Sequence, residues 1–276
     1  MRYNPILLGI LAFLSFSAPA EAASISLGQA QRFSVLGGST VTNTGPSIIT
    51  GDLGVSPGTA VTGFPPGLVV SGTINPSSVV QAQQDNAYAY GLLRDLSSTQ
   101  SLTGQNLGGL TLNSGVYDFL SSAQLTGTLT LNNSVDPNAV FVFNIGSTLT
   151  TASDSIVRFS DGSNNPNVFF RVGSSATLGN GTQFQGNILA ATSITLNDGA
   201  TIQCGRALAQ SGAVTLNNNS VSTACTPPLT SVPIPGTTPG TMPVPTPVPT
   251  PALLPGLLGL GLSLWRRKTG AMEGAS

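Results

Sequence analysis

The chain has 276 residues and a formal net charge of −1, and only 7% of its residues are charged, against roughly one quarter in a typical soluble domain. It contains no histidine, which excludes Ser-His-Asp and Cys-His catalytic sites and histidine-ligated metal centres. A near-neutral chain has no basic surface to neutralise phosphates, so nucleic acid is excluded as a partner. We therefore expect a protein that is not an enzyme, with no catalytic residues, no bound metal and no cofactor.

The N-terminus has the pattern of a secretory signal. Arg2 precedes an apolar run over residues 6–16, and small residues follow up to Ala22. The run is shorter than the roughly 20 residues that span a membrane, and its order of charge, apolar core and small residues is typical of a cleaved signal. We expect residues 1–22 to be a signal peptide and the mature chain to be secreted or held at the cell surface.

The C-terminus combines a linker with an apolar segment. Residues 226–251 are so rich in proline that neither a helix nor a central strand can form there. Residues 252–265 carry no charge, and a basic cluster follows at residues 266–268. A basic cluster after an apolar segment favours a membrane segment whose end lies in the cytoplasm.

Residues 249–252, PTPA, together with the LLPGLLGLGLSLWRRK that follows, resemble the PTPA-type relative of the PEP-CTERM sorting signals. The resemblance implies that an exosortase-like protease is a partner, that it removes the tail at residues 252–276, and that the protein reaches the cell surface or the extracellular matrix. A short transmembrane helix that stays in place is the alternative.

Between residues 23 and 225 a Thr-Leu pair recurs. The threonines of these pairs are Thr111, Thr130, Thr148, Thr177, Thr195 and Thr215. Most of the steps between them are about 18 to 20 residues, which accommodates three short strands, or one coil of a triangular β-helix. The longer step contains the turn-forming run SDGSNNPN at residues 160–167, which we expect to leave the coil as a loop. The pattern predicts a mostly β fold, a β-solenoid.

One helix pattern interrupts the strands. Asn75 is placed as its N-cap and Pro76 as its first residue. Its apolar stripe consists of Val79, Ala82, Ala89, Leu93 and Leu96. Because the strands at residues 140–145 and 167–172 are apolar on both sides, we expect this helix, about 21 residues long, to lie along the solenoid and cover them. The strands before and after the helix must then share one core.

Cys204 and Cys225 are the only cysteines. In an exported chain a disulfide between them is expected, and two free thiols are the alternative.

Four segments, residues 37–67, 108–119, 136–153 and 186–219, look like the microbial ice-binding protein family. The resemblance covers the domain at residues 23–225. It implies a right-handed, discontinuous β-solenoid of triangular section with one long α-helix packed alongside. It also implies that one flat face of the solenoid adsorbs to ice, so that an ice crystal surface is the partner.

Two arrays of side chains compete for the ice-binding role. The first follows one corner into a neighbouring face, and Ser39, Thr40 and Thr42 are candidates to extend it. Its residues are Thr151, Ser153, Ser155, Asn180, Thr182, Thr201, Ser220 and Ser222. The second is the ladder of Thr-Leu pairs, with the leucines pointing inward. Its residues are Thr148, Thr177, Thr195 and Thr215. We favour the first array because the T-A/G-x-T/N pattern of the family maps there.

The sequence therefore predicts a secreted ice-binding protein that inhibits ice growth or recrystallisation. The alternative is a structural or adhesion protein of the cell surface or matrix, with extracellular polysaccharide as its partner and no ice activity.

Overall fold

The computed structural model describes residues 25–225. The segments expected to be the signal peptide (1–22), the linker (226–251) and the sorting tail (252–276) lie outside the described residues. The described chain is mostly β, with one sheet of 14 strands and one of seven, and every strand pairing is parallel. The helices described are the short 3-10 helix η1 (Gly28–Arg32) and the α-helix α1 (Val79–Arg94).

The strands form three faces, which we call A, B and C. Face A lies under α1 and consists of β4 (Asp52–Val55), β1 (Phe33–Gly37), the C-terminal parts of β19 (Thr201–Ala209) and β17 (Gln183–Ala190), β15 (Val168–Val172), β12 (Phe141–Ile145), β9 (Gly115–Phe119) and β7 (Gln100–Ser101). Face B is the seven-stranded sheet of β10 (Ala123–Leu125), β13 (Leu149–Thr151), β16 (Ala176–Leu178), β18 (Ile194–Leu196), β20 (Val214–Asn217), β2 (Thr40–Thr44) and β5 (Ala60–Thr62). Face C consists of β8 (Thr111–Leu112), β11 (Thr128–Leu131), β14 (Ile156–Phe159), the N-terminal parts of β17 and β19, β21 (Ser220–Ser222), β3 (Ile48–Thr50) and β6 (Leu68–Val70).

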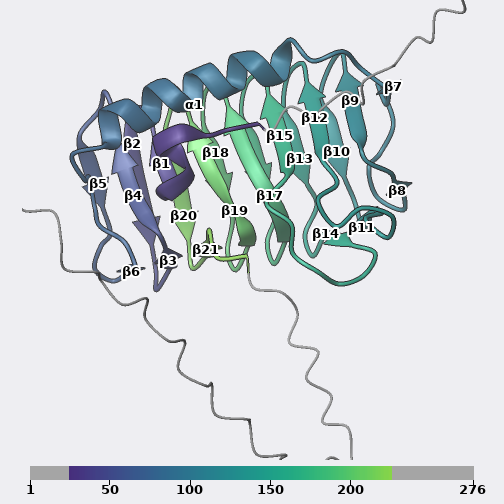
Figure 1. Ribbon diagram of the computed structural model, residues 1–276. Coiled ribbons are helices and arrows are strands. Elements are labelled where there is room, and N and C mark those ends of the chain that lie inside the picture. The colour runs from purple at the N-terminus through teal and green to yellow at the C-terminus, as the bar shows by residue number, and fades with distance from the viewer. Residues whose placement is uncertain (1–24, 226–276) are drawn as a thin grey trace, which may run out of the picture. The chain divides into compact units, whose positions relative to one another are not determined.

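The coils do not stack in the order of the chain. The coil at residues 201–222 ends the described domain, yet it pairs with the coil at residues 33–50 on all three faces. The second N-terminal coil, with β5 and β6, forms one end of the stack, and β7 and β8 form the other end (Figure 1). The expectation that the strands before and after the helix share one core is confirmed, and the run at residues 160–167 is indeed a loop between β14 and β15.

The interior holds a ladder of aromatic rings in contact with one another. The ring centroids of Tyr117 and Phe143 are 5.5 Å apart, those of Phe143 and Phe170 4.4 Å, and those of Phe170 and Phe184 4.7 Å. Tyr117, Phe143 and Phe170 come from successive strands of face A and repeat at about the spacing of the strands, whereas Phe184 meets Phe170 from face C at a tilt of 55°. This packing fixes the coils relative to one another and supports flat faces outside.

Helix α1 covers face A, as the apolar stripe predicts. Ala82, Ala89 and Leu93 are buried together with Phe169 and Leu208 of the strands below. The expected start of the helix at residues 75–76 is wrong. Asn75 has a φ of 48° and its side chain accepts a hydrogen bond from the Val55 amide, so it belongs to the preceding turn. The helix begins at Val79 and has 16 residues, a length of about 24 Å.

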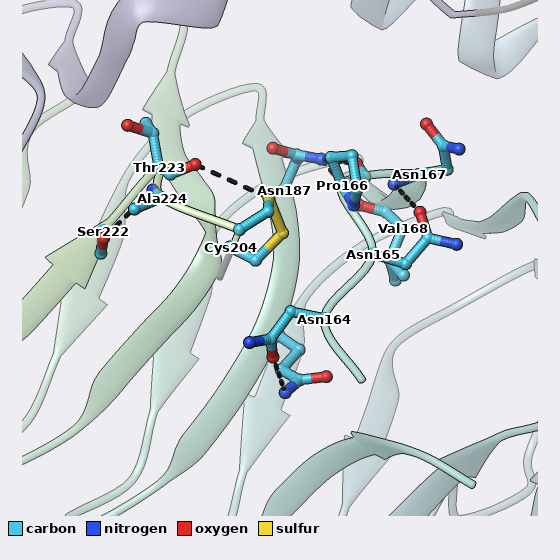
Figure 2. Close-up of a disulfide and its surroundings, with 12 residues drawn as sticks. Asn164, Asn165, Pro166, Asn167, Val168, Asn187, Cys204, Ser222, Thr223 and Ala224 are labelled. Carbon is cyan, nitrogen blue, oxygen red and sulfur yellow. Dashed lines mark hydrogen bonds between the residues drawn. A yellow bond between two sulfur atoms is a disulfide. The ribbon is translucent and has the colours of Figure 1, made fainter. Parts of the chain in front are cut away.

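Cys204 and Cys225 form a disulfide with a Cα–Cα distance of 4.4 Å, at the corner where β19 passes from face C to face A (Figure 2). In this corner Cys204 and Gly205 both lie opposite Gly186 of β17, which makes a β-bulge. A Cβ atom on Gly205 would overlap the Gly186 carbonyl oxygen, so only glycine fits. The disulfide therefore fixes the end of the described domain at the corner between faces A and C, which is the corner away from face B.

Candidate functional site

Face B carries six threonines in register on six adjacent strands. We call them the threonine row: Thr150, Thr177, Thr195, Thr215, Thr42 and Thr62. Gln124 occupies the same position on β10. The last two members come from the N-terminal coils, so the row crosses the junction between the two ends of the domain. Adjacent threonines are separated by one strand spacing, about 4.8 Å.

The side chains of the threonine row point away from the core. In five of the six strands both neighbours of the threonine are buried, as Ile194 and Leu196 are beside Thr195, and beside Thr62 they are half-buried, so strand alternation turns the threonines outward. Every member is exposed or half-exposed. Within residues 25–225, no hydrogen bond occupies the hydroxyl group of any of the six. These hydroxyls are therefore free to bind water.

Face B is regular as well as polar. The pairings of its seven strands contain no register shift, whereas face A joins face C through the bulge at Gly186. Buried leucines such as Leu178 and Leu216 support it from below. None of its strands contains a charged residue. The result is a flat, uncharged surface with a fixed repeat.

The rows that flank the threonine row differ from it. On one side, Asn217 pairs with Thr44 and both side chains are exposed. On the other side, the hydroxyl of Thr148 donates to Ser122 at 2.9 Å. Ser193 likewise accepts a hydrogen bond, from the Ala213 amide. Some hydroxyls on this second side thus already form hydrogen bonds within the protein. The threonine row therefore has more hydroxyls available to bind water.

Three of the eight residues of the first array expected from the sequence are buried. Thr151, Ser155 and Thr182 are buried, with exposed fractions of 3%, 0% and 0%. The hydroxyls of Thr151 and Thr182 form a hydrogen bond of 2.7 Å, and that of Ser155 donates to the Leu125 carbonyl at 2.9 Å. The expectation that these three residues face ice is wrong, because at the corner between faces B and C their side chains turn inward and satisfy the polar groups there.

The other members of the first array lie at separate places. Ser153 and Asn180 are exposed in turns at the corner between faces B and C. Thr201, Ser220 and Ser222 lie on face C. The register aligns Thr201 with Gln183 on one side and with Ser220 on the other, and Ser220 is next to Ile48. Face C thus lacks a continuous row of hydroxyls.

Three of the four residues of the second array lie together on face B. Thr177, Thr195 and Thr215 belong to the threonine row, but Thr148 lies two residues out of register, where Thr150 takes its place. The Thr-Leu motif misled here because the buried residues of β13 are Leu149 and Thr151, so the outward threonine stands between them. The alternation of inward and outward side chains over residues 149–151 predicts that Thr150 points outward. Thr42 and Thr62 are not part of a Thr-Leu pair. Their place in the row follows only from the order in which the coils stack.

Metal and membrane features are not part of this site. Residues 25–225 contain no group of three or more His, Cys, Asp or Glu side chains that could hold a metal ion. Of the helices within that range, none is long and apolar enough to cross a membrane.

Residues 35–222 match the sequence model of the ice-binding-like family. The chain belongs to this family. It is 64% identical over 227 residues to an ice-binding protein of Nostoc sp. (strain HG1), which covers 81% of this chain and 84% of the relative. It is also similar to the crystal structure of an ice-binding protein from the Antarctic ascomycete Antarctomyces psychrotrophicus, with a TM-score of 0.69, 39% identity, and coverage of 72% of this chain and 98% of the other. An ice-binding protein from an Antarctic biological consortium matches with a TM-score of 0.68 and 40% identity, over 80% of this chain and 96% of the other.

Proposed function

We propose that this member of the ice-binding-like family binds ice through face B and so inhibits ice growth or recrystallisation. The observation that carries the proposal is the threonine row, with six hydroxyls in register and without partners in the described domain. The names of the similar proteins support the same function. Family membership favours it over a matrix protein without ice activity.

A row of this kind can hold water in a lattice-like order. Threonine on a strand has a stiff χ1 angle, a hydroxyl that binds one water and a methyl group that restrains its neighbours. The strand stack repeats these groups at about 4.8 Å. Because the aromatic ladder and the buried leucines hold the backbone in place, little entropy is lost when the face meets ice. Adsorbed protein then forces the ice front to curve between contact points, which opposes growth.

Faces A and C are less suitable. Face A is covered by α1, whose Ala82, Ala89 and Leu93 pack directly on it. Face C carries Ile48 and Leu68 at one end and Arg158 toward the other, all exposed. Bulky and charged side chains of different lengths prevent a planar contact. Face B is therefore the face that we propose contacts ice. The buried corner residues Thr151, Ser155 and Thr182, which the sequence favoured, are not part of the proposed contact.

The finer points of the architecture and processing belong to the same proposal. We infer a right-handed solenoid of triangular section, an exported protein without enzymatic activity, and a sorting tail at residues 252–276 that an exosortase-like protease recognises. The disulfide corner lies between faces A and C, away from face B.

The proposal is tested by placing a large side chain in the centre of the threonine row. Thr195→Tyr projects a ring from face B, and we expect the protein concentration needed to stop ice recrystallisation to rise at least about tenfold, the equivalent of about 1.4 kcal/mol. Thr201→Tyr is the matched control on face C, where we expect no change in ice activity. Both variants should retain the melting temperature of the parent protein because both side chains point outward. Unaltered activity of Thr195→Tyr, or loss in the Thr201→Tyr control alone, would assign the contact elsewhere.

A further inference from the structure

A groove on face C carries a second set of polar groups. Its cavity volume is about 170 Å³, and Arg158, Gln183, Gln185 and Gln203 line it around Ile156. Pockets for drug-sized ligands have roughly 300–1,000 Å³. The groove therefore has room for one small ring, such as one sugar residue of a longer chain.

The strand register brings these side chains together. Ile156 of β14 pairs with Gln183 of β17, and Gln185 of β17 pairs with Gln203 of β19. Arg158, two residues after Ile156, points to the same side of its strand. Three amides and one guanidinium thus converge from three adjacent strands.

The polar groups of the groove are unevenly satisfied. The Gln185 amide nitrogen donates at 2.6 Å to the side-chain oxygen of Asn164, a residue of the 160–167 loop. Its carbonyl oxygen is buried and has no donor within the described domain. No hydrogen bond or ion pair joins the exposed Arg158 guanidinium to another residue of that domain. The groove therefore offers an unused cation and an unused acceptor.

The chain that directly follows the described domain, residues 226–265, does not complement this charge. Between Arg206 and Arg266 the sequence contains no charged residue, so the 40 residues that follow Cys225 in the chain, 226–265, contain no carboxylate side chain for Arg158. A ligand that satisfies the groove needs an anionic group together with hydroxyls that donate to and accept from amides.

We propose that this groove binds a uronic acid residue of an acidic polysaccharide. The planar guanidinium of Arg158 pairs with the sugar carboxylate through two parallel hydrogen bonds. The amides of Gln183 and Gln203 bind ring hydroxyls, and the Gln185 carbonyl oxygen accepts from one of them. Ile156 lies against the apolar face of the ring. One such contact is weak, but a polymer with many uronate residues can hold many copies of the protein.

This site is distinct from the ice-binding face and does not depend on it. The groove is on face C, next to the Cys204–Cys225 corner, whereas the threonine row is on face B. A polysaccharide at the groove leaves face B open. The protein can thus be retained in an acidic extracellular matrix while its threonine row contacts ice.

The experiment is a calorimetric or NMR titration of the full chain with tri-galacturonic acid. The matched control ligand is the same trimer with its carboxyl groups reduced to alcohols. We expect saturable binding of the acidic trimer, and binding of the reduced trimer weaker by about tenfold or more, since a hydrogen bond to a charged group contributes roughly 1.5–3 kcal/mol.

Variants locate the site. Arg158→Gln is expected to weaken binding of the acidic trimer about tenfold, and Gln185→Leu to weaken it severalfold. Arg94→Gln removes the same charge from the exposed surface of α1 and is expected to change nothing. Ice recrystallisation inhibition should be equal in all three, which separates this site from face B.

Absence of saturable binding would overturn the proposal. Equal binding of the acidic and the reduced trimer would overturn the assignment of a uronate. Equal loss in Arg158→Gln and Arg94→Gln would show attraction by net charge alone and would overturn the groove as the site.

Discussion

The buried hydroxyl pair at the corner between faces B and C gives a sharp test of which residues face ice. The Gly179 amide donates to the Thr151 hydroxyl at 2.9 Å, the Thr151 and Thr182 hydroxyls are 2.7 Å apart, and Thr182 donates to the Ala152 carbonyl at 3.3 Å. Thr182→Val keeps the shape of the side chain and removes the middle of this chain of hydrogen bonds. The Thr151 hydroxyl then loses its acceptor in a site from which water is excluded.

The cost follows from that loss. A buried polar group left without a partner costs about 1–3 kcal/mol, and 1 kcal/mol shifts the melting temperature of a domain of this size by about 2–4 °C. We therefore expect Thr182→Val to lower the melting temperature by about 2–12 °C. Ice recrystallisation inhibition, measured near 0 °C where the variant is still folded, should be unchanged because the hydroxyl never meets solvent.

The assay pairs a thermal unfolding curve with the ice assay on the same preparation. Thr128→Val is the matched control, since Thr128 lies half-exposed on face C and an outward substitution of this kind changes stability by less than about 0.5 kcal/mol. If Thr182→Val kept the parent melting temperature and lost ice activity, the burial argument would be refuted and the corner array would become the ice-binding site.

Three further predictions concern the scaffold and the face. Replacing Cys204 and Cys225 by alanine should lower the free energy of unfolding by about 3 kcal/mol in the chain-entropy model, measured by urea denaturation, while ice activity near 0 °C stays the same; equal stability with and without the disulfide would contradict this. Gly205→Ala should reduce the yield of folded protein sharply, because the new Cβ overlaps the Gly186 carbonyl oxygen; a normal melting temperature would show that the bulge can relax. Ice activity should be constant from about pH 5 to pH 9, because the strands of face B carry no titratable side chain, and a transition in that range would show that a titratable group outside those strands contributes to the activity.

Much of the fold could be predicted from the sequence because its signals are local. The repeat of Thr177 and Leu178, of Thr195 and Leu196, and of Thr215 and its neighbour indicates short strands with one face inward. The stripe through Ala82, Ala89 and Leu93 likewise predicts which side of the helix is buried, because side-chain direction in a helix or strand follows from position alone.

The start of the helix was less predictable. Asn75 and Pro76 form a typical N-terminus by composition, but the Asn75 side chain bonds the Val55 amide of another coil instead. A cap residue has alternative partners nearby only after the coils have stacked, so the sequence could not show which partner it takes.

The candidate site was determined only in part by the sequence. The repeat was enough to predict Thr177, Thr195 and Thr215, since each lies between two buried residues of one strand. Thr42 and Thr62 join the same row only because the N-terminal coils pair with the C-terminal coil. That register is set by packing between segments more than 150 residues apart in the chain, and no local pattern encodes it. The tertiary structure also turned Thr151 and Thr182 inward, because the corner between faces B and C bends the backbone and its polar groups need partners.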